Sequence, residues 1–156
     1  MTAPALDWAE VAQAVSEVVG SSVGWETPAS VARRAGIPSD LSGAFIPLAG
    51  EGMAIQLGLT GTDASCRMLA AALLQCSADE VAALPLAEVA DAVCEVVNIA
   101  AGHVKARLVE SQQGIALGLP LFIHGAVQPG DRMDVDVFDL RFGEVPLVLV
   151  LLHRRG

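Results

Sequence analysis

The chain has 156 residues, of which 53% are hydrophobic, and its mean hydropathy is +0.54. Its most apolar run, residues 145–152, is much shorter than the roughly 20 residues that a helix needs to cross a bilayer. The net charge is −9, and only one of the nine basic residues is a lysine, which argues against nucleic acid as a partner. We therefore expect one soluble, cytoplasmic domain over residues 1–156, with no membrane insertion and no nucleic-acid binding.

The first half of the chain predicts a helix, a hairpin and a second helix. Apolar residues recur at helical spacing up to Gly20, which we expect to end the first helix. The connection that follows is rich in glycine and proline, and Thr62 with Asp63 can cap the next helix. The predicted elements are a helix over residues 5–19, a short strand over 29–33, strands over 43–49 and 53–59 with a Gly-Glu-Gly turn, and a helix from 62 to about 76.

The second half predicts one long helix and then strands. A capping box at Ser77–Glu80 opens a short turn, followed by a long helix over residues 86–109 and strands over 115–119, 121–126, 133–140 and 145–152. Asp134 and Asp136 alternate with apolar residues, which indicates a solvated acidic face that protects a sheet edge. The fold class that follows is α+β, a mainly antiparallel mixed sheet with long helices packed on one face.

The most informative polar residues lie on the long helix. Asn98 is the only asparagine in the chain, and it stands mid-helix, where asparagine is a mediocre helix former. Steps of three and four place it on one helical stripe with Asp91, Glu95, Gly102 and Lys105. Taken alone, this pattern is also typical of a solvated helix face.

In its context this stripe resembles the E-x-x-N motif of the CheC/CheX/FliY phosphatases. Asp91 to Lys105 carries the motif once, as in CheX, and Pro120 follows at about the family's spacing. The resemblance implies a CheX-like fold and an aspartyl-phosphate phosphatase that acts in chemotaxis on the receiver domain of a CheY-type response regulator. It implies that Asn98 orients the attacking water, that Glu95 pairs with the receiver's lysine, and that Asp91, Gly102 and Lys105 contact the partner.

The resemblance also sets expectations for cofactors and assembly. The chain itself binds no metal or cofactor, because Mg²⁺ is expected in the receiver. A homodimer formed by joining sheets is a further expectation; the apolar strand over residues 145–152 would either serve that purpose or lie in the middle of one sheet.

Two other functions remain open at this point. The same fold could dock a receiver or a flagellar-switch component without catalysis, or it could act in a two-component system outside chemotaxis. The remaining candidates favour structural roles: the three cysteines have no CxxC spacing, and no nucleophile set includes His103, His124 or His153.

Overall fold

The computed structural model describes residues 6–26, 28–109 and 114–154. Within these ranges the helices are α1 (Trp8–Val23), α2 (Asp63–Leu74), α3 (Ala78–Ala82) and α4 (Leu86–Val109). The strands are β1 (Ser30–Arg34), β2 (Leu41–Gly50), β3 (Met53–Gly61), β4 (Ala116–Leu117), β5 (Leu121–Gly125), β6 (Met133–Phe142) and β7 (Val145–Arg154). The order of elements is the predicted one; residue 5, where the first helix is predicted to begin, lies outside the described residues.

The strands form one antiparallel sheet in the order β1-β6-β7-β3-β2-β4, and β5 pairs with β2 on the same side as β4. β2 and β3 are joined by the predicted turn at residues 50–52. β7 lies between β3 and β6, so the most apolar strand occupies the middle of the sheet. The α+β prediction, with helices on a mainly antiparallel sheet, is confirmed.

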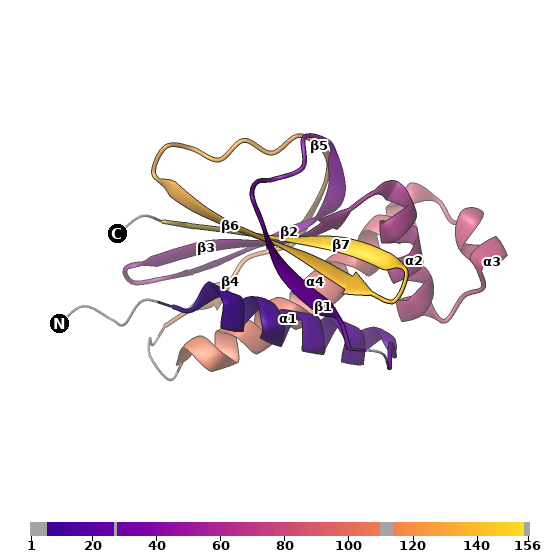
Figure 1. The fold of residues 1–156 in the computed structure, drawn as a ribbon, viewed down its shortest axis with the longest axis horizontal. Helices are drawn as coiled ribbons and strands as arrows, with labels where there is room; N and C mark the ends of the chain where they lie inside the picture. Colours follow the sequence, from indigo (N-terminus) through magenta and orange to yellow (C-terminus); the bar gives the residue numbers. More distant parts are fainter. Residues whose placement is uncertain (1–5, 27, 110–113, 155–156) are drawn as a thin grey trace.

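Helices α1 and α4 lie side by side along one face of the sheet (Figure 1). α1 packs on β1 and β6, and α4 packs on β2, β3 and β5. Their inward side chains join the sheet in one buried cluster, in which each fully buried valine or leucine contributes roughly 1.5–3 kcal/mol. Members of this cluster include Val15, Val19, Val93, Val97, Leu57 and Leu149.

Gly20 does not end the first helix, so that prediction is wrong. α1 continues to Val23, and Gly24, in the left-handed conformation at φ 76°, ends it. Gly20 is buried inside the helix, where an added Cβ would lie 3.4 Å from the Phe142 ring. The glycine therefore allows close packing of α1 on β6, a role that local sequence signals do not distinguish from a helix stop.

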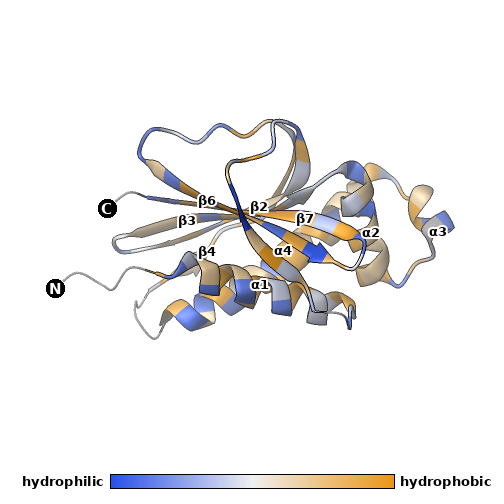
Figure 2. Cartoon of the chain, viewed as in Figure 1, coloured by the Kyte–Doolittle hydropathy of each residue, from blue (hydrophilic) through white to orange (hydrophobic). Residues whose placement is uncertain are grey.

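The opposite face of the sheet is covered by two long connections rather than by helices. The segments over residues 35–40 and 126–132 arch over this face, the second one drawn in orange in Figure 1. Under them, Phe45, Val137, Val150 and neighbouring residues form a second, smaller cluster. Figure 2 shows the apolar run of β7, which supplies buried residues to both clusters.

The solvated, edge-protecting acidic face predicted for Asp134 and Asp136 is wrong. β6 lies between β1 and β7 and is not an edge strand. Its even-numbered residues share the helix-covered face with Phe138 and Leu140, so the acidic side chains turn toward α1. A carboxylate in that position needs partners, because taking an unpaired charge out of water is costly.

Asp136 has such partners on three other elements. It forms an ion pair with Arg33 of β1, and one carboxylate oxygen lies 2.7 Å from Nε2 of His153 on β7. The indole of Trp8, in the first turn of α1, stacks on the His153 ring with a centroid separation of 4.1 Å. We call these four residues the Asp136 cluster. Burial alone would raise the pKa of Asp136, but the hydrogen bonds with His153 and Arg33 outweigh it and lower the pKa below its ordinary value of 3.8.

Candidate functional site

The candidate site lies on α4, which the rest of the fold holds in place. Besides the sheet, α4 packs against α1 and α2. The connection from α3 into α4 is fixed by Arg67, whose Nη1 donates to the carbonyl oxygens of Val81 at 3.0 Å and Leu84 at 3.3 Å. The Arg67 Nε also donates to Asp63 at 3.1 Å. A helix held from several sides can present its outer residues with little motion.

The outward side of α4 carries the residues that the sequence singled out. Asp91, Glu95 and Asn98 are exposed, and Gly102 and Lys105 are half-buried. Helical geometry aligns these five residues, which we call the outer stripe, while the intervening valines and alanines are buried. The pair at positions 95 and 98 is thus approachable from solvent rather than sealed inside the protein.

Glu95 and Asn98 have no polar partner in the described part of the chain. No hydrogen bond or ion pair found there involves either side chain, although the fold satisfies the polar groups of the Asp136 cluster. A free carboxamide offers one acceptor oxygen and two donor hydrogens, and a free carboxylate offers only acceptors. The pair can therefore accept from a cation or ammonium group at one point and orient a small polar molecule at the other.

The thiol next to this pair is a poor candidate for chemistry. Burial, and to a smaller degree the nearby Asp91 carboxylate, raise the pKa of the Cys94 thiol. The pKa of the buried Cys66 thiol is raised to about 12 for the same kinds of reason, with burial first and Asp63 second. Since the thiolate is the nucleophile, neither cysteine is activated.

Pro120 lies at the sheet edge next to α4. It directly precedes β5, which pairs with β2 and packs against α4. The residues on either side of it, Leu119 and Leu121, are 88% and 64% exposed. The strand predicted over residues 115–119 is reduced to the two residues of β4, so this proline stands in a connection between two short edge strands.

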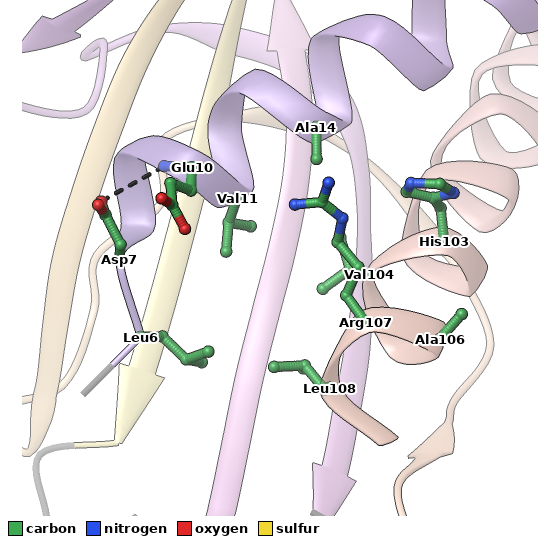
Figure 3. Close-up of a pocket in the computed structure, with 10 residues that line it drawn as sticks. All are labelled: Leu6, Asp7, Glu10, Val11, Ala14, His103, Val104, Ala106, Arg107 and Leu108. Atoms are coloured by element: carbon green, nitrogen blue, oxygen red, sulfur yellow. Dashed lines mark hydrogen bonds between the residues drawn. The ribbon is translucent and has the colours of Figure 1, made fainter. Parts of the chain in front are cut away.

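The sequence did not indicate two further features of this surface. Ile99, next to Asn98, is 37% exposed, whereas the valines of α4 from Val89 to Val104 are buried. A groove of about 580 Å³ runs between the first turns of α1 and the last turns of α4 (Figure 3). No local pattern could have shown this groove, because residues 6–14 and 103–108 come together only in the fold.

In ranges 6–26, 28–109 and 114–154 there is no group of three or more His, Cys, Asp or Glu residues arranged to hold a metal ion. None of the helices in those ranges is long and apolar enough to span a membrane.

Comparison with protein families identifies the fold and the site region together. The family model described as "Chemotaxis phosphatase CheX" matches residues 42–129, which is more than half of the chain and includes α4 with Glu95 and Asn98. The chain belongs to the CheX family. The predicted relationship to CheC/CheX/FliY proteins, CheX-like in particular, is confirmed, and the family's description supports a phosphatase role at the level of the family.

Solved structures with this fold include CheX and FliY proteins. A CheX–CheY–BeF3–Mg²⁺ complex from Borrelia burgdorferi matches with a TM-score of 0.76 at 18% identity, covering 97% of this chain and 100% of that one. CheX from Desulfovibrio desulfuricans matches with a TM-score of 0.72 at 18% identity, covering 93% and 99%. FliY from Thermotoga maritima matches with a TM-score of 0.63 at 14% identity, covering 92% and 86%. At these identities the likeness shows the fold, and no curated protein matches the chain.

Proposed function

We propose that this chain, acting as one domain over residues 1–156, removes the phosphoryl group from the aspartate of a CheY-type receiver domain. The observation that carries the proposal is Asn98, an exposed carboxamide without a polar partner among the described residues, one turn beyond Glu95 on a helix held by three neighbours. Membership of a chemotaxis phosphatase family supports the reaction class. The printed description of the Borrelia burgdorferi complex supports a CheY-like partner.

In the proposed reaction, water attacks the phosphorus of the acyl phosphate. The bond from phosphorus to the aspartate oxygen breaks, its electron pair stays on the carboxylate, and the water's proton leaves with inorganic phosphate. The receiver's own Mg²⁺ neutralises charge on the phosphoryl oxygens, so what this chain contributes is alignment of the water. The Asn98 carbonyl oxygen accepts a hydrogen bond from the water, and its NH₂ group donates to a phosphoryl oxygen.

The other residues of the outer stripe position the receiver. Glu95 accepts from the receiver's lysine and so fixes the register in which Asn98 reaches the phosphate. Asp91, about one turn before Glu95, and Lys105, about two turns after Asn98, add charged contacts to the receiver. Gly102 leaves the helix surface bare for a close approach. No cofactor bound by this chain is part of the mechanism; the Mg²⁺ belongs to the receiver.

The test is the decay of a phosphorylated CheY-type receiver with wild type, with Asn98→Ala and with Asn98→Gln. We expect Asn98→Ala to lower the rate about 100-fold, the usual effect of removing one positioned group from a transition state. Asn98→Gln keeps the carboxamide but moves it by one methylene, and a misplacement of about 1 Å can also cost about 100-fold. Rates for Asn98→Ala equal to those of wild type would rule out the proposed role of Asn98.

The same assay separates the non-catalytic alternative. A receiver loaded with beryllofluoride and Mg²⁺ that binds this chain, while the phosphorylated receiver decays no faster with it than without it, would support a docking module. If this chain accelerates dephosphorylation of a receiver from outside chemotaxis and has no effect on chemotaxis receivers, its activity belongs to another two-component pathway.

A homodimer remains part of the proposal. β7 is flanked by β3 and β6, so a sheet that continues into a second copy would have to use one of the edge strands β1, β4 or β5. Light scattering coupled to size-exclusion chromatography tests this, since a mass that stays monomeric at every concentration would remove the dimer.

A further inference from the structure

His124 and Ser42 form a side-chain pair at the edge of the sheet that the proposed reaction does not use. Nδ1 of His124 lies 2.7 Å from Oγ of Ser42, and the two residues are direct neighbours on β5 and β2. Ser42 is only 3% exposed, whereas His124 is exposed. The ring therefore uses one nitrogen at a buried hydroxyl, and its other nitrogen, Nε2, has no partner among the described residues.

This contact fixes which ring nitrogen carries the hydrogen. The Ser42 hydroxyl has one hydrogen to donate, and the described part of the chain offers it no acceptor other than Nδ1 of His124. A buried donor without an acceptor costs about 1–3 kcal/mol, so the hydroxyl donates to Nδ1 and the ring hydrogen stays on Nε2. Ser42 itself is too buried to attack a substrate, so the pair presents a donor and not a nucleophile.

Asn98 lies on the flank of α4 that faces away from α1. Successive residues of a helix are rotated by about 100°, so Asn98 is turned about 140° from His103 and about 180° from Arg107, which line the groove with α1. α1 packs on β1 and β6, whereas α4 packs on β2, β3 and the edge strand β5. The flank of α4 that carries Asn98 therefore borders the edge strand that carries His124.

His124 also lies on the helix-covered side of the sheet, near the level of Asn98. Phe122 of β5 packs in the buried cluster on that side, so strand alternation places His124 there too. β4 follows α4, contacts it and pairs with Leu48 of β2. From that level, His124 opposite Ser42 is six strand residues or about 20 Å away, and Asn98 is eleven helical residues or about 16 Å before the end of α4.

A receiver that presents its phosphoryl group to Asn98 reaches this edge. A standard interface covers about 800 Å² on each partner, which for a round patch corresponds to a radius of about 16 Å. The surroundings of the phosphoryl group are rich in acceptors, because proteins hold Mg²⁺ through carboxylates together with phosphate oxygens. A donor fixed beside Asn98 suits such a surface.

We propose that His124 is a receiver-contact residue whose Nε2–H donates to a carboxylate oxygen beside the phosphorylation site. Ser42 is the positioning residue, because its hydroxyl holds the ring and keeps the hydrogen on Nε2. This inference rests on the proposed function, since the partner is the same receiver that presents its phosphoryl group to Asn98. In this arrangement His124 contributes to affinity, and Asn98 governs the chemical step.

The first test compares His124→Asn with His103→Asn in the full chain. Asparagine keeps a polar atom near the position of Nδ1 for Ser42 but has no atom in place of Nε2, so it separates the two roles of the ring. His103→Asn is the matched control, because His103 is also exposed but lies on the α1 side of α4. For both variants and for Asn98→Ala, two quantities are measured: the dissociation constant for a receiver carrying beryllofluoride and Mg²⁺, and the dephosphorylation rate at saturating phosphorylated receiver.

We expect His124→Asn to raise the dissociation constant about tenfold, the effect of one lost hydrogen bond to a charged group, with the saturated rate within about twofold of wild type. His103→Asn should bind as wild type does, and Asn98→Ala should lose rate instead. If His124→Asn binds as wild type does, or no worse than His103→Asn, the inference fails, and the proposed function stands as long as Asn98→Ala loses activity. If wild type neither binds nor dephosphorylates a receiver, the proposed function fails and this inference fails with it.

The second test uses the wild-type chain and so does not depend on how a variant folds. Diethyl pyrocarbonate modifies accessible imidazole nitrogens, and mass spectrometry measures the modified fraction at each histidine. A saturating receiver carrying beryllofluoride and Mg²⁺ should lower modification of His124 several-fold and leave that of His103 unchanged. Unchanged modification of His124 in the complex would overturn the inference, and this result alone decides if His124→Asn does not fold.

Discussion

The Asp136 cluster and the outer stripe of α4 are both polar groups on regular elements, and they differ in what the fold does for them. Arg33, His153 and Trp8 surround Asp136 from β1, β7 and α1, and its side chain is only 18% exposed. Glu95 and Asn98 are exposed on a helix that packs against α1, α2 and the sheet, yet the described residues provide them with no partner. Polar groups that a fold satisfies stabilise it, whereas unsatisfied groups on a rigid support are available to another molecule.

The largest effect should come from changing the charge at Asn98 without changing its shape. Asn98→Asp is isosteric, but its carboxylate would meet the like charge of the phosphoryl group and cannot donate to it. We expect dephosphorylation at saturating receiver to fall about 100-fold, as for loss of a positioned hydrogen bond in a transition state. The melting temperature should not change, because the side chain has no partner in the described part of the fold. Activity of Asn98→Asp close to wild type would show that a neutral carboxamide is not required.

The opposite behaviour is expected for the Asp136 cluster. Asp136→Ala removes two charge-assisted interactions and leaves His153 and Arg33 without their acceptor, so the free energy of unfolding should fall by about 2 kcal/mol. The saturated dephosphorylation rate of the folded variant should remain that of wild type. Urea unfolding monitored by circular dichroism measures the first quantity, and the receiver assay measures the second. A loss of activity with unchanged stability would place Asp136 with the functional residues instead.

A smaller effect of the same cluster should appear as a pH dependence of stability. The pKa of Asp136 is lower in the folded protein than its ordinary value of 3.8. At a pH between the folded-state pKa and the ordinary value, the unfolded state therefore binds more protons than the folded state. The contribution of Asp136 to stability is therefore fully present above about pH 4 and is lost as the pH falls through the folded-state pKa. Urea unfolding of wild type and Asp136→Asn between about pH 3 and 6 should show a stability difference that shrinks at the acidic end. A difference that grows toward acidic pH would contradict this sign.

The comparison also shows what the sequence could and could not predict. The outer stripe lies within one helix, so the 3.6-residue period and the single asparagine were enough to place Asp91, Glu95 and Asn98 together. The Asp136 cluster joins the consecutive strands β6 and β7 to α1 and β1 near the other end of the chain. Strand alternation gave the shared face of Asp134 and Asp136 but not what covers it. Strand order depends on long-range pairing, which explains why β6 was taken for an edge.

Gly102 allows the finest test, because stability and binding should change in opposite directions there. Gly102→Ala adds a Cβ that meets nothing in the described fold, so it should raise the free energy of unfolding by up to about 1 kcal/mol. The same methyl group should weaken binding of the beryllofluoride-loaded receiver by less than tenfold, since it covers only part of the bare helix surface at which the receiver is proposed to approach. Ala64→Gly, at an exposed position of α2, is the control: it should lower stability by a comparable or smaller amount and leave binding unchanged. A Gly102→Ala variant that is less stable than wild type would mean that another part of the protein fills the space beside this glycine. The glycine would then be explained by packing within the fold and not by the approach of a receiver.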